Sequence, residues 1–299
     1  MKSSKKESAV QISHPEKVFW PEDGYTKGDL ANFYREVFPW LQPYVRGRIL
    51  TMERCPDGMQ GECFYQKEMP NGMPPGTPAK RLPNKSGSRA FTNYVVGGSL
   101  ETQMALVNLG CIPVHVTGSR AETFPKPDWL CLDIDPMSGS FQDAARASLL
   151  VRKFLDELRL VSFPKTSGSR GVHIFIPIKT GPTADDVLSF AEKLVALAAK
   201  SHPKELTVER RIADRGDRVY LDPFRNGSVQ TVVAPFSVRR KPHAPVSTPL
   251  DWAEVARVKD PAEFNIKTLP KRLKKKDSWA DFFSRRQSLQ PALKQIDRL

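Results

Sequence analysis

Residues 129–136 read Trp-Leu-Cys-Leu-Asp-Ile-Asp-Pro, an apolar run that ends in two carboxylates. The run predicts a strand over Trp129–Asp135, and side chains alternate between the two faces of a strand. Asp133 and Asp135 then share one face, about 6.5–7 Å apart, and carboxylates so close repel one another unless a cation lies between them. Such a pair can hold Mg²⁺ or Mn²⁺, although by itself it favours a strand end that caps the following helix.

A third acid ends another predicted strand, Arg218–Asp222. Period-two alternation places Asp222 on the face opposite the apolar side chains of that strand. Carboxylates that converge on two metal ions are the arrangement used for in-line phosphoryl transfer. We therefore predict that Asp133, Asp135 and Asp222 are catalytic and bind two ions, Mn²⁺ or Mg²⁺.

The next motif is a glycine-rich turn that leads directly into a strand and reads KTSGSRGVH over residues 165–173. Such a turn can present backbone N–H groups and hydroxyls to phosphate oxygens, and Arg170 and His173 add further donors. It is not a Walker A loop, because it lacks G-K-[ST] and enters a strand rather than a helix. An ordinary hairpin turn fits the motif equally well, and Arg225, Gln230 and Arg239, taken singly, fit plain surface positions.

Hydrophobic periodicity predicts interleaved helices and strands, which is typical of an α/β or α+β fold. Pro39 and Pro43 should end the first helix, and the Pro/Gly-rich stretch 68–89 should be a surface loop. The remaining predicted elements are helices over Gly28–Leu41, 100–109 and Phe141–Leu160, a helix capped by Thr183 that runs to Ala199, and strands over Ile112–Thr117, Val172–Ile178 and Ser228–Pro235.

The composition is strongly basic, with a net charge of +13 in 299 residues. A basic surplus favours polyanionic partners, either nucleic acid or an anionic membrane. The surplus is largest in residues 267–299, which hold ten Lys and Arg against three Asp. The sequence contains neither an apolar run long enough to span a bilayer nor a signal peptide, so we expect a cytoplasmic, nucleoid-associated protein without a membrane partner.

The four cysteines are Cys55, Cys63, Cys111 and Cys131. They form no C-x-x-C pair, so a structural zinc site is not expected. In a chain without a secretory signal we expect all four to be reduced thiols.

Three motifs together resemble a known family. They are LDIDP at 132–136, TSGSRGVHIFIPI at 166–178 and YLDPFRNGSVQTVVAPFSVRRKPHAPVSTPLDW at 220–252. In this order and spacing they resemble the polymerase domain of the bacterial DNA ligase D proteins, members of the archaeo-eukaryotic primase superfamily. The resemblance runs from about His14 to Leu269. It implies an RRM-like catalytic sheet joined to an N-terminal α/β module, and template-directed synthesis at broken DNA ends, with ribonucleotides preferred and Mn²⁺ often favoured.

The resemblance also implies roles for individual residues. Asp133, Asp135 and Asp222 match the metal-binding triad, and His115 matches a histidine beside the nucleotide sugar. Family members commonly have Lys where Arg170 stands. The implied nucleotide-binding residues are His115, Ser167, Arg170, His173, Arg225, Gln230 and Arg239.

DNA contacts are implied at two places near the N-terminus. Lys17 and Lys27 correspond to lysines that bind the 5′-phosphate at the far side of a gap, although the local sequence indicates only that they are exposed. The run Phe64-Tyr65-Gln66-Lys67 resembles a Phe-Phe-Gln-Lys run whose aromatic rings stack on template bases. We therefore predict DNA binding by Phe64, Tyr65 and Lys67 as well.

The chain lacks a ligase K-x-D-G motif, so the resemblance implies a stand-alone polymerase. We expect residues 1–13 to be disordered and 14–299 to form one domain, with an N-terminal module at about 14–120, a catalytic module at about 121–265 and a basic tail at 266–299. The predicted role is gap filling and end extension from NTPs or dNTPs in non-homologous end joining, with Ku and a separate DNA ligase as possible partners. The alternatives are a primase that starts strands de novo and a non-catalytic module that bridges DNA ends.

Overall fold

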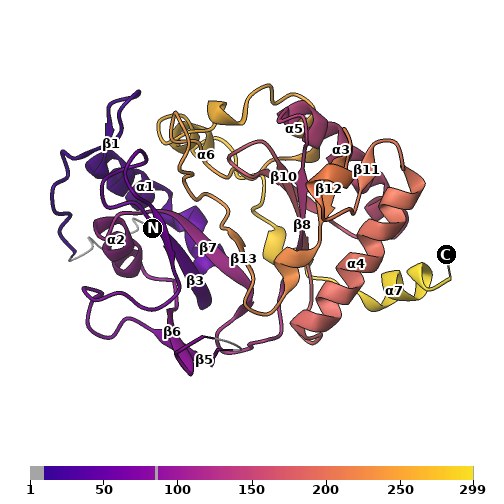
Figure 1. Ribbon diagram of the computed structural model, residues 1–299, viewed down its shortest axis with the longest axis horizontal. Coiled ribbons are helices and arrows are strands. Elements are labelled where there is room, and N and C mark those ends of the chain that lie inside the picture. The colour runs from indigo at the N-terminus through magenta and orange to yellow at the C-terminus, as the bar shows by residue number, and fades with distance from the viewer. Residues whose placement is uncertain (1–9, 85–86, 299) are drawn as a thin grey trace.

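The computed structural model describes residues 10–84 and 87–298. Figure 1 shows two sheet-centred halves side by side, with β3, β7 and β13 in one and β8, β10 and β12 in the other. The strands are β1 (Val18–Trp20), β2 (Tyr25–Thr26), β3 (Arg48–Arg54), β4 (Phe64–Gln66), β5 (Ala79–Pro83), β6 (Phe91–Val95), β7 (Cys111–Arg120), β8 (Trp129–Asp135), β9 (Phe163–Thr166), β10 (Val172–Pro177), β11 (Leu206–Thr207), β12 (Val219–Asp222) and β13 (Thr231–Val233). The α-helices are α1 (Lys27–Val45), α2 (Leu100–Asn108), α3 (Phe141–Glu157), α4 (Ala184–Ser201), α5 (Trp252–Val255), α6 (Leu269–Leu273) and α7 (Gln290–Ile296).

The second half is built on a five-stranded sheet of order β11-β12-β8-β10-β9. Along the chain its elements run β8, α3, β9, β10, α4 and then β11 and β12. This is the βαββαβ arrangement of an RRM-like sheet, so the predicted α+β fold with an RRM-like sheet is confirmed. Thr183 caps α4 as predicted, through a reciprocal capping box with Asp186.

Alternation along β8 explains how this sheet acquires a polar site on one face. Leu130, Leu132 and Ile134 are buried in the core that α3 and α4 share with the sheet. The opposite face of the strand begins apolar, with Trp129 and Cys131 in the other core. It ends with Asp133 and Asp135, so the acids lie on the face that α3 and α4 leave uncovered.

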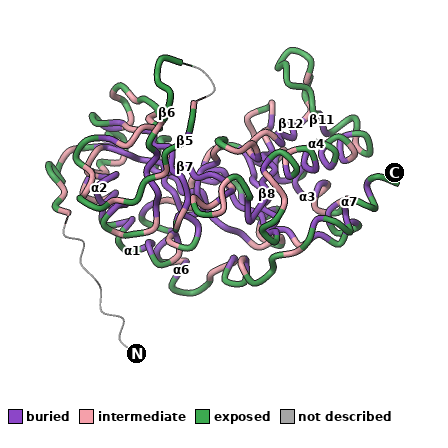
Figure 2. Tube along the Cα trace, turned by 90° about the horizontal axis from the view of Figure 1, so that it is seen from below, coloured by how far each residue is buried: buried purple, intermediate pink, exposed green. Residues whose placement is uncertain are grey.

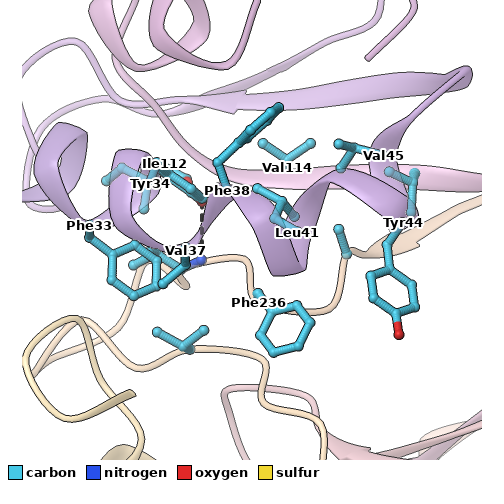
Figure 3. Packing of buried hydrophobic residues seen from close by; sticks show 14 of the residues in the cluster. Phe33, Tyr34, Val37, Phe38, Leu41, Tyr44, Val45, Ile112, Val114 and Phe236 are labelled. Atoms are coloured by element: carbon cyan, nitrogen blue, oxygen red, sulfur yellow. Dashed lines mark hydrogen bonds between the residues drawn. The ribbon is translucent and has the colours of Figure 1, made fainter. Parts of the chain in front are cut away.

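The first half holds a four-stranded sheet of order β13-β7-β3-β4. Its core is formed by α1 packed against residues of β7 and the segment that follows β13 (Figure 3). The Tyr34 hydroxyl ties these parts together: it donates to the Ile112 carbonyl at 2.7 Å and accepts from the Val238 N–H at 3.1 Å. Since β13 comes from beyond residue 120, the predicted catalytic module contributes a strand to the other sheet. The predicted module boundaries stay a prediction.

The prediction that prolines end the first helix is wrong. Helix α1 continues to Val45 with Pro39 and Pro43 inside it. Beyond Pro39 the helix buries Leu41 and Tyr44, and the Tyr44 ring packs among aromatic rings of both halves. Burial of this apolar face offsets the hydrogen bonds that proline removes.

Two further expectations from composition need correction. The stretch 68–89 is not wholly loop, because it contains β5, which pairs antiparallel with β6. The predicted basic tail at 266–299 is not a free tail, since Trp279 and Phe282 are buried in the core that also contains the apolar residues of α1. Figure 2 shows buried residues concentrated around β7 and β8, where the halves meet.

No helix among the described residues has the length and apolarity needed to cross a bilayer.

The expected disorder of residues 1–13 is wrong for its last part, because Val10 and Ile12 pack against the hydrophobic core of the first half. The Ser13 N–H and hydroxyl both donate to Asn108 Oδ1, at 2.8 and 2.9 Å. Residues 1–9 lie outside the described residues.

The expectation of four reduced thiols is also wrong, because Cys55 and Cys63 form a disulfide. Strands β3 and β4 pair antiparallel with Arg54 opposite Phe64. Cys55, which follows Arg54, therefore lies beside Cys63, which precedes Phe64. Cys111 and Cys131 are free and buried. The pairing follows from the strand register, which cysteine spacing alone does not reveal.

Removing this disulfide should lower the free energy of unfolding. The two cysteines are eight residues apart in the sequence. A disulfide over this separation lowers the conformational entropy of the unfolded chain, which raises the free energy of unfolding by about 2–3 kcal/mol. We expect the Cys55→Ala/Cys63→Ala variant, in denaturant unfolding monitored by tryptophan fluorescence, to lose this amount relative to the oxidised wild type. A dithiol reductant should destabilise the wild type equally and leave the variant unchanged. Equal wild-type stability with and without reductant would contradict the prediction.

Candidate active site

Three predicted site residues lie in a row across neighbouring strands. Asp222 of β12 is paired with Asp133 of β8, and Asp133 is paired with His173 of β10. Asp135 follows on the same face of β8, opposite Tyr220. Asp133 and Asp222 are each at most 9 % exposed. The sheet therefore brings the three predicted acids to one place, as the sequence predicts.

Arg225 bridges two of these acids. Its Nε donates to Asp133 Oδ2 at 3.1 Å, and its Nη2 lies 3.6 Å from Asp222 Oδ2. His173 Nε2 lies 3.2 Å from Asp133 Oδ1. Although burial alone would raise the pKa of Asp133, His173 and Arg225 hold that pKa well below its ordinary value. Asp133 is thus the acid that stays ionised.

The other two acids have the opposite electrostatics. Burial and then the neighbouring Asp133 raise the pKa of Asp135 to about 7. Burial and Asp133 likewise raise the pKa of Asp222, although its Oδ1 accepts from the Phe224 N–H at 2.7 Å. Carboxyl groups pushed apart in pKa by like charges are typical of functional sites.

A cavity of about 460 Å³ opens beside the acids. Its lining combines acidic groups with donors predicted for the nucleotide. The sequence-predicted residues in its lining are Tyr65, His115, Asp133, Asp135, Ser167, Arg170, His173, Arg225 and Arg239.

The glycine-rich turn is held together by its first hydroxyl. Ser167 Oγ accepts from the backbone N–H groups of Ser169 at 3.2 Å and Gly171 at 3.1 Å. These two amides therefore point into the turn rather than toward a ligand. The Ser167 hydroxyl proton and the exposed Arg170 guanidinium stay available to an anion.

Glycine is required at two positions of this turn because of close approach. Gly168 has φ +70°, and a Cβ there would lie 2.5 Å from Arg239 Cγ. A Cβ on Gly171 would lie 2.7 Å from the Ile134 carbonyl oxygen. The first contact brings Arg239 to the cavity, and the second packs the turn against β8, next to the acids.

His115 and Tyr65 meet at another part of the cavity. Their rings are in edge contact, with centroids 5.9 Å apart. His115 is 9 % exposed and its Nε2 has no hydrogen-bond partner. Burial, then the cationic Arg239, lowers the pKa of His115 well below its ordinary value. The ring is therefore a neutral group with an unused polar atom beside the cavity.

The remaining predicted residues are not all in the cavity. Gln230 is exposed and outside the lining. Phe64 and Lys67 are exposed on and just after β4, next to Tyr65. The Arg54 guanidinium lies 5.4 Å from the Phe64 ring centroid. Exposed aromatic side chains beside cations suit a nucleic-acid surface.

Lys17 and Lys27 lie together, but the expectation that both are exposed is wrong for Lys27, which is 6 % exposed. Lys27 Nζ donates to the Ser13 carbonyl at 2.8 Å and to Asn108 Oδ1 at 3.0 Å. Lys17 forms an ion pair with Asp57. Burial, and then the charge of Lys17, lowers the pKa of Lys27, so the two ammonium groups are close enough to repel.

Two basic residues at or behind the cavity, Arg215 and Lys165, had no predicted role. Arg215 lies in the loop before β12, with its guanidinium 3.8 Å from the Tyr220 ring centroid. No periodicity or motif marks such a loop position. Lys165 opens the glycine-rich motif but is fully buried behind His173, and only the strand register shows that it belongs to the row of acids.

The carboxylate oxygens of the three acids are ligands of the kind that hard cations prefer. Asp133 Oδ1 is buried and accepts no well-formed hydrogen bond, even though His173 Nε2 is near. Carboxylate oxygens are the ligands that Mg²⁺ and Mn²⁺ prefer. Within the described residues, however, no group of three His, Cys, Asp or Glu is already arranged to hold an ion.

Comparison with known proteins identifies the family. A model of the family described as "LigD, primase-polymerase domain" matches residues 26–279. The chain is 29 % identical over 291 residues to the multifunctional non-homologous end joining protein LigD of Pseudomonas aeruginosa. This alignment covers 96 % of this chain and 34 % of that protein. It is 28 % identical over 268 residues to the bifunctional LigD of Bacillus subtilis, covering 89 % of this chain and 43 % of that protein.

A solved structure supports the same assignment. The polymerase domain of Mycobacterium tuberculosis ligase D in complex with DNA superposes with a TM-score of 0.84 at 25 % identity, over 93 % of this chain and 98 % of that one. The chain spans about a third of the Pseudomonas relative. A primase-polymerase domain is by its chemistry a nucleotidyltransferase. The chain therefore belongs to the LigD primase-polymerase domain family and is a nucleotidyltransferase.

Proposed function

We propose that the chain adds nucleotides to the 3′ end of a DNA strand at gaps and broken ends, copying a template, in non-homologous end joining. The observation that supports this most is one cavity lined both by the acids Asp133 and Asp135 and by Ser167, Arg170, His173 and Arg239. A nucleoside triphosphate needs both kinds of group, since its phosphates require donors and the bond that breaks requires charge neutralisation.

In this proposal Asp133, Asp135 and Asp222 hold two divalent ions, Mg²⁺ or Mn²⁺. When bound there, such ions would supply activation of the attacking 3′-hydroxyl and neutralisation of charge on the leaving pyrophosphate. The carboxylates themselves contribute fixed positions on adjacent strands, which keep their oxygens close together. Arg225 balances the charge of Asp133 and Asp222 within the protein.

The basic side of the cavity orients the triphosphate. The guanidinium groups of Arg170 and Arg239 can each bind phosphate oxygens in a bidentate manner. The Ser167 hydroxyl and His173 Nε2–H supply neutral donors between them. Because Gly168 permits Arg239 to lie directly against the turn, these donors converge without surface loops having to close.

A preference for ribonucleotides is part of the proposal. His115 Nε2 is buried beside the cavity without a partner, and a ribose 2′-hydroxyl could satisfy it. A deoxyribose would leave the atom unpaired, at the usual cost of a buried polar group. Ku and a separate ligase stay predictions of the sequence resemblance.

The test is nucleotide incorporation on defined DNA. The protein is incubated with a gapped duplex that bears a downstream 5′-phosphate, with each NTP or dNTP and with Mg²⁺ or Mn²⁺. Templated extension of the primer into the gap supports the proposal. Strand synthesis on a template without a primer supports a primase instead. DNA-end bridging without incorporation under any of these conditions supports the non-catalytic module.

The raised pKa of Asp135 predicts a pH-dependent cost to stability in ion-free protein. The ordinary pKa of Asp135 is 3.8, and its pKa in the folded protein is about 7. The contribution of the protonated Asp135 side chain to the free energy of unfolding is therefore complete below the ordinary pKa and is lost as pH rises through 7. Asp135→Asn should therefore be more stable than the wild type at pH 8, by about 2 kcal/mol after allowance for solvent screening. At pH 5 the two proteins should differ less.

The measurement is thermal or denaturant unfolding in a chelator across this pH range. The control is Asp217→Asn, which removes an exposed acid elsewhere in the same half. A wild-type-minus-variant difference that does not change with pH would contradict the assignment.

A further inference from the structure

Lys165 extends the row of site residues across a fourth strand. It lies on β9 directly opposite His173 of β10, and His173 is in turn opposite Asp133 of β8. None of its surface is exposed, and it is absent from the cavity lining. A fully buried ammonium group is costly unless its donors are used, so its contacts define what it does.

The contacts of Lys165 join it to two side chains. Its Nζ lies 2.8 Å from His173 Nδ1 and also contacts Ser247 Oγ. The Ser247 hydroxyl proton is used elsewhere, because Ser247 Oγ donates to the Thr166 carbonyl at 2.8 Å, so Ser247 accepts from Lys165. Burial lowers the pKa of Lys165 to about 7, whereas the Phe175 ring, 5.4 Å from Nζ, favours the charged form. As an ammonium group Lys165 has three donors and no acceptor, and His173 Nδ1 then accepts from it.

The other nitrogen of the His173 ring faces the acids. Nε2 lies 3.2 Å from Asp133 Oδ1, without a well-formed hydrogen bond between the two atoms. A neutral ring that accepts from Lys165 at Nδ1 carries its proton on Nε2. Because His173 lines the cavity, this N–H is available to a ligand there.

We propose that Lys165 is a positioning residue for nucleotidyl transfer, which anchors His173 Nδ1 so that the ring keeps its Nε2–H at the cavity. The inference rests on the proposed function, because it takes the cavity beside His173 to be the place where the triphosphate binds. Lys165 touches no part of the cavity and acts only through His173. Without the anchor the ring can rotate about its Cβ–Cγ bond, and the donor is no longer held in place.

A double-mutant cycle separates this role from a merely structural one. Lys165→Met, which keeps the length of the buried side chain, should raise KM for the nucleotide about tenfold with a smaller change in kcat. In the His173→Ala background the same substitution should raise KM no further. An equal increase in both backgrounds, or none in either, overturns the proposal. Lys200→Met, which removes an exposed lysine of α4, is the matched control.

A spectroscopic measurement on the wild type needs no variant and no nucleotide. Only five histidines are present, and ¹⁵N-resolved ring spectra compared with His173→Ala assign the signals of His173. The expected result is a proton on Nε2 and a bare, hydrogen-bonded Nδ1. A proton on Nδ1 overturns the proposal, because Lys165 would then have to accept. Should Lys165→Met not fold, Ser247→Ala replaces it in the cycle, since it removes the second anchor of Nζ.

The two hypotheses fail in different ways. If the proposed function is wrong, the wild type incorporates no nucleotide, whatever the state of the His173 ring. If the role of Lys165 is wrong, the wild type is active and either the ring tautomer or the double-mutant cycle departs from expectation.

Discussion

Replacing Asp133 or Asp222 by asparagine should reduce nucleotide addition by at least about 10³-fold. Two ions held by carboxylates lower the barrier to phosphoryl transfer by several kcal/mol, and each 1.4 kcal/mol corresponds to about a factor of ten in rate. An amide keeps the size of the side chain but removes its charge. Primer extension on a gapped duplex, at saturating NTP with Mg²⁺ or Mn²⁺, measures the loss.

The same variants should keep the fold and bind DNA, because the predicted DNA contacts lie elsewhere, on β4 and near the N-terminus. Ion binding should stabilise the wild type against thermal unfolding and stabilise neither variant. Asp217→Asn, which removes an exposed acid in the loop before β12, is the matched control. Near wild-type extension by either triad variant would remove that acid from the catalytic site.

Local sequence patterns were sufficient to predict the elements that build this site. The apolar run before Asp133 gave the bounds of β8 correctly, and alternation correctly placed Asp133 and Asp135 on one face of it and Asp222 opposite the apolar side chains of β12. The predicted cap at Thr183 correctly placed the start of α4. These features depend on side-chain period and hydrogen bonding within a few residues.

What the sequence did not reveal depends on contacts between distant segments. Helix α1 continues past Pro39 because its last turns are buried by aromatic residues from both halves of the protein. Cys55 and Cys63 meet because of the register of β3 and β4. The role of Lys165 depends on three strand pairings at once. Packing and register are properties of the whole fold, so local periodicity cannot supply them.

Replacing both Lys17 and Lys27 by alanine should abolish a preference for DNA ends that bear a 5′-phosphate. Burial, and then the charge of Lys17, lowers the pKa of Lys27, and an anion bound beside the two ammonium groups would offset their repulsion. Charge-assisted hydrogen bonds contribute about 1.5–3 kcal/mol each, so we expect the discrimination to fall by about 100-fold. The variant should still extend a simple primer-template, because neither lysine lines the cavity.

The measurement is a competition gel shift between gapped duplexes that differ only in a downstream 5′-phosphate or 5′-hydroxyl. Lys153→Ala/Lys200→Ala removes the same charge from exposed positions on α3 and α4 and should keep the preference. Asp57 pairs with Lys17 and competes with the phosphate, so Asp57→Asn should strengthen the preference. Binding of the phosphorylated duplex should also depend more steeply on salt, since each neutralised phosphate releases counterions. Equal binding of both duplexes by the wild type would refute the phosphate site and favour a primase, which has no need to recognise the far side of a gap.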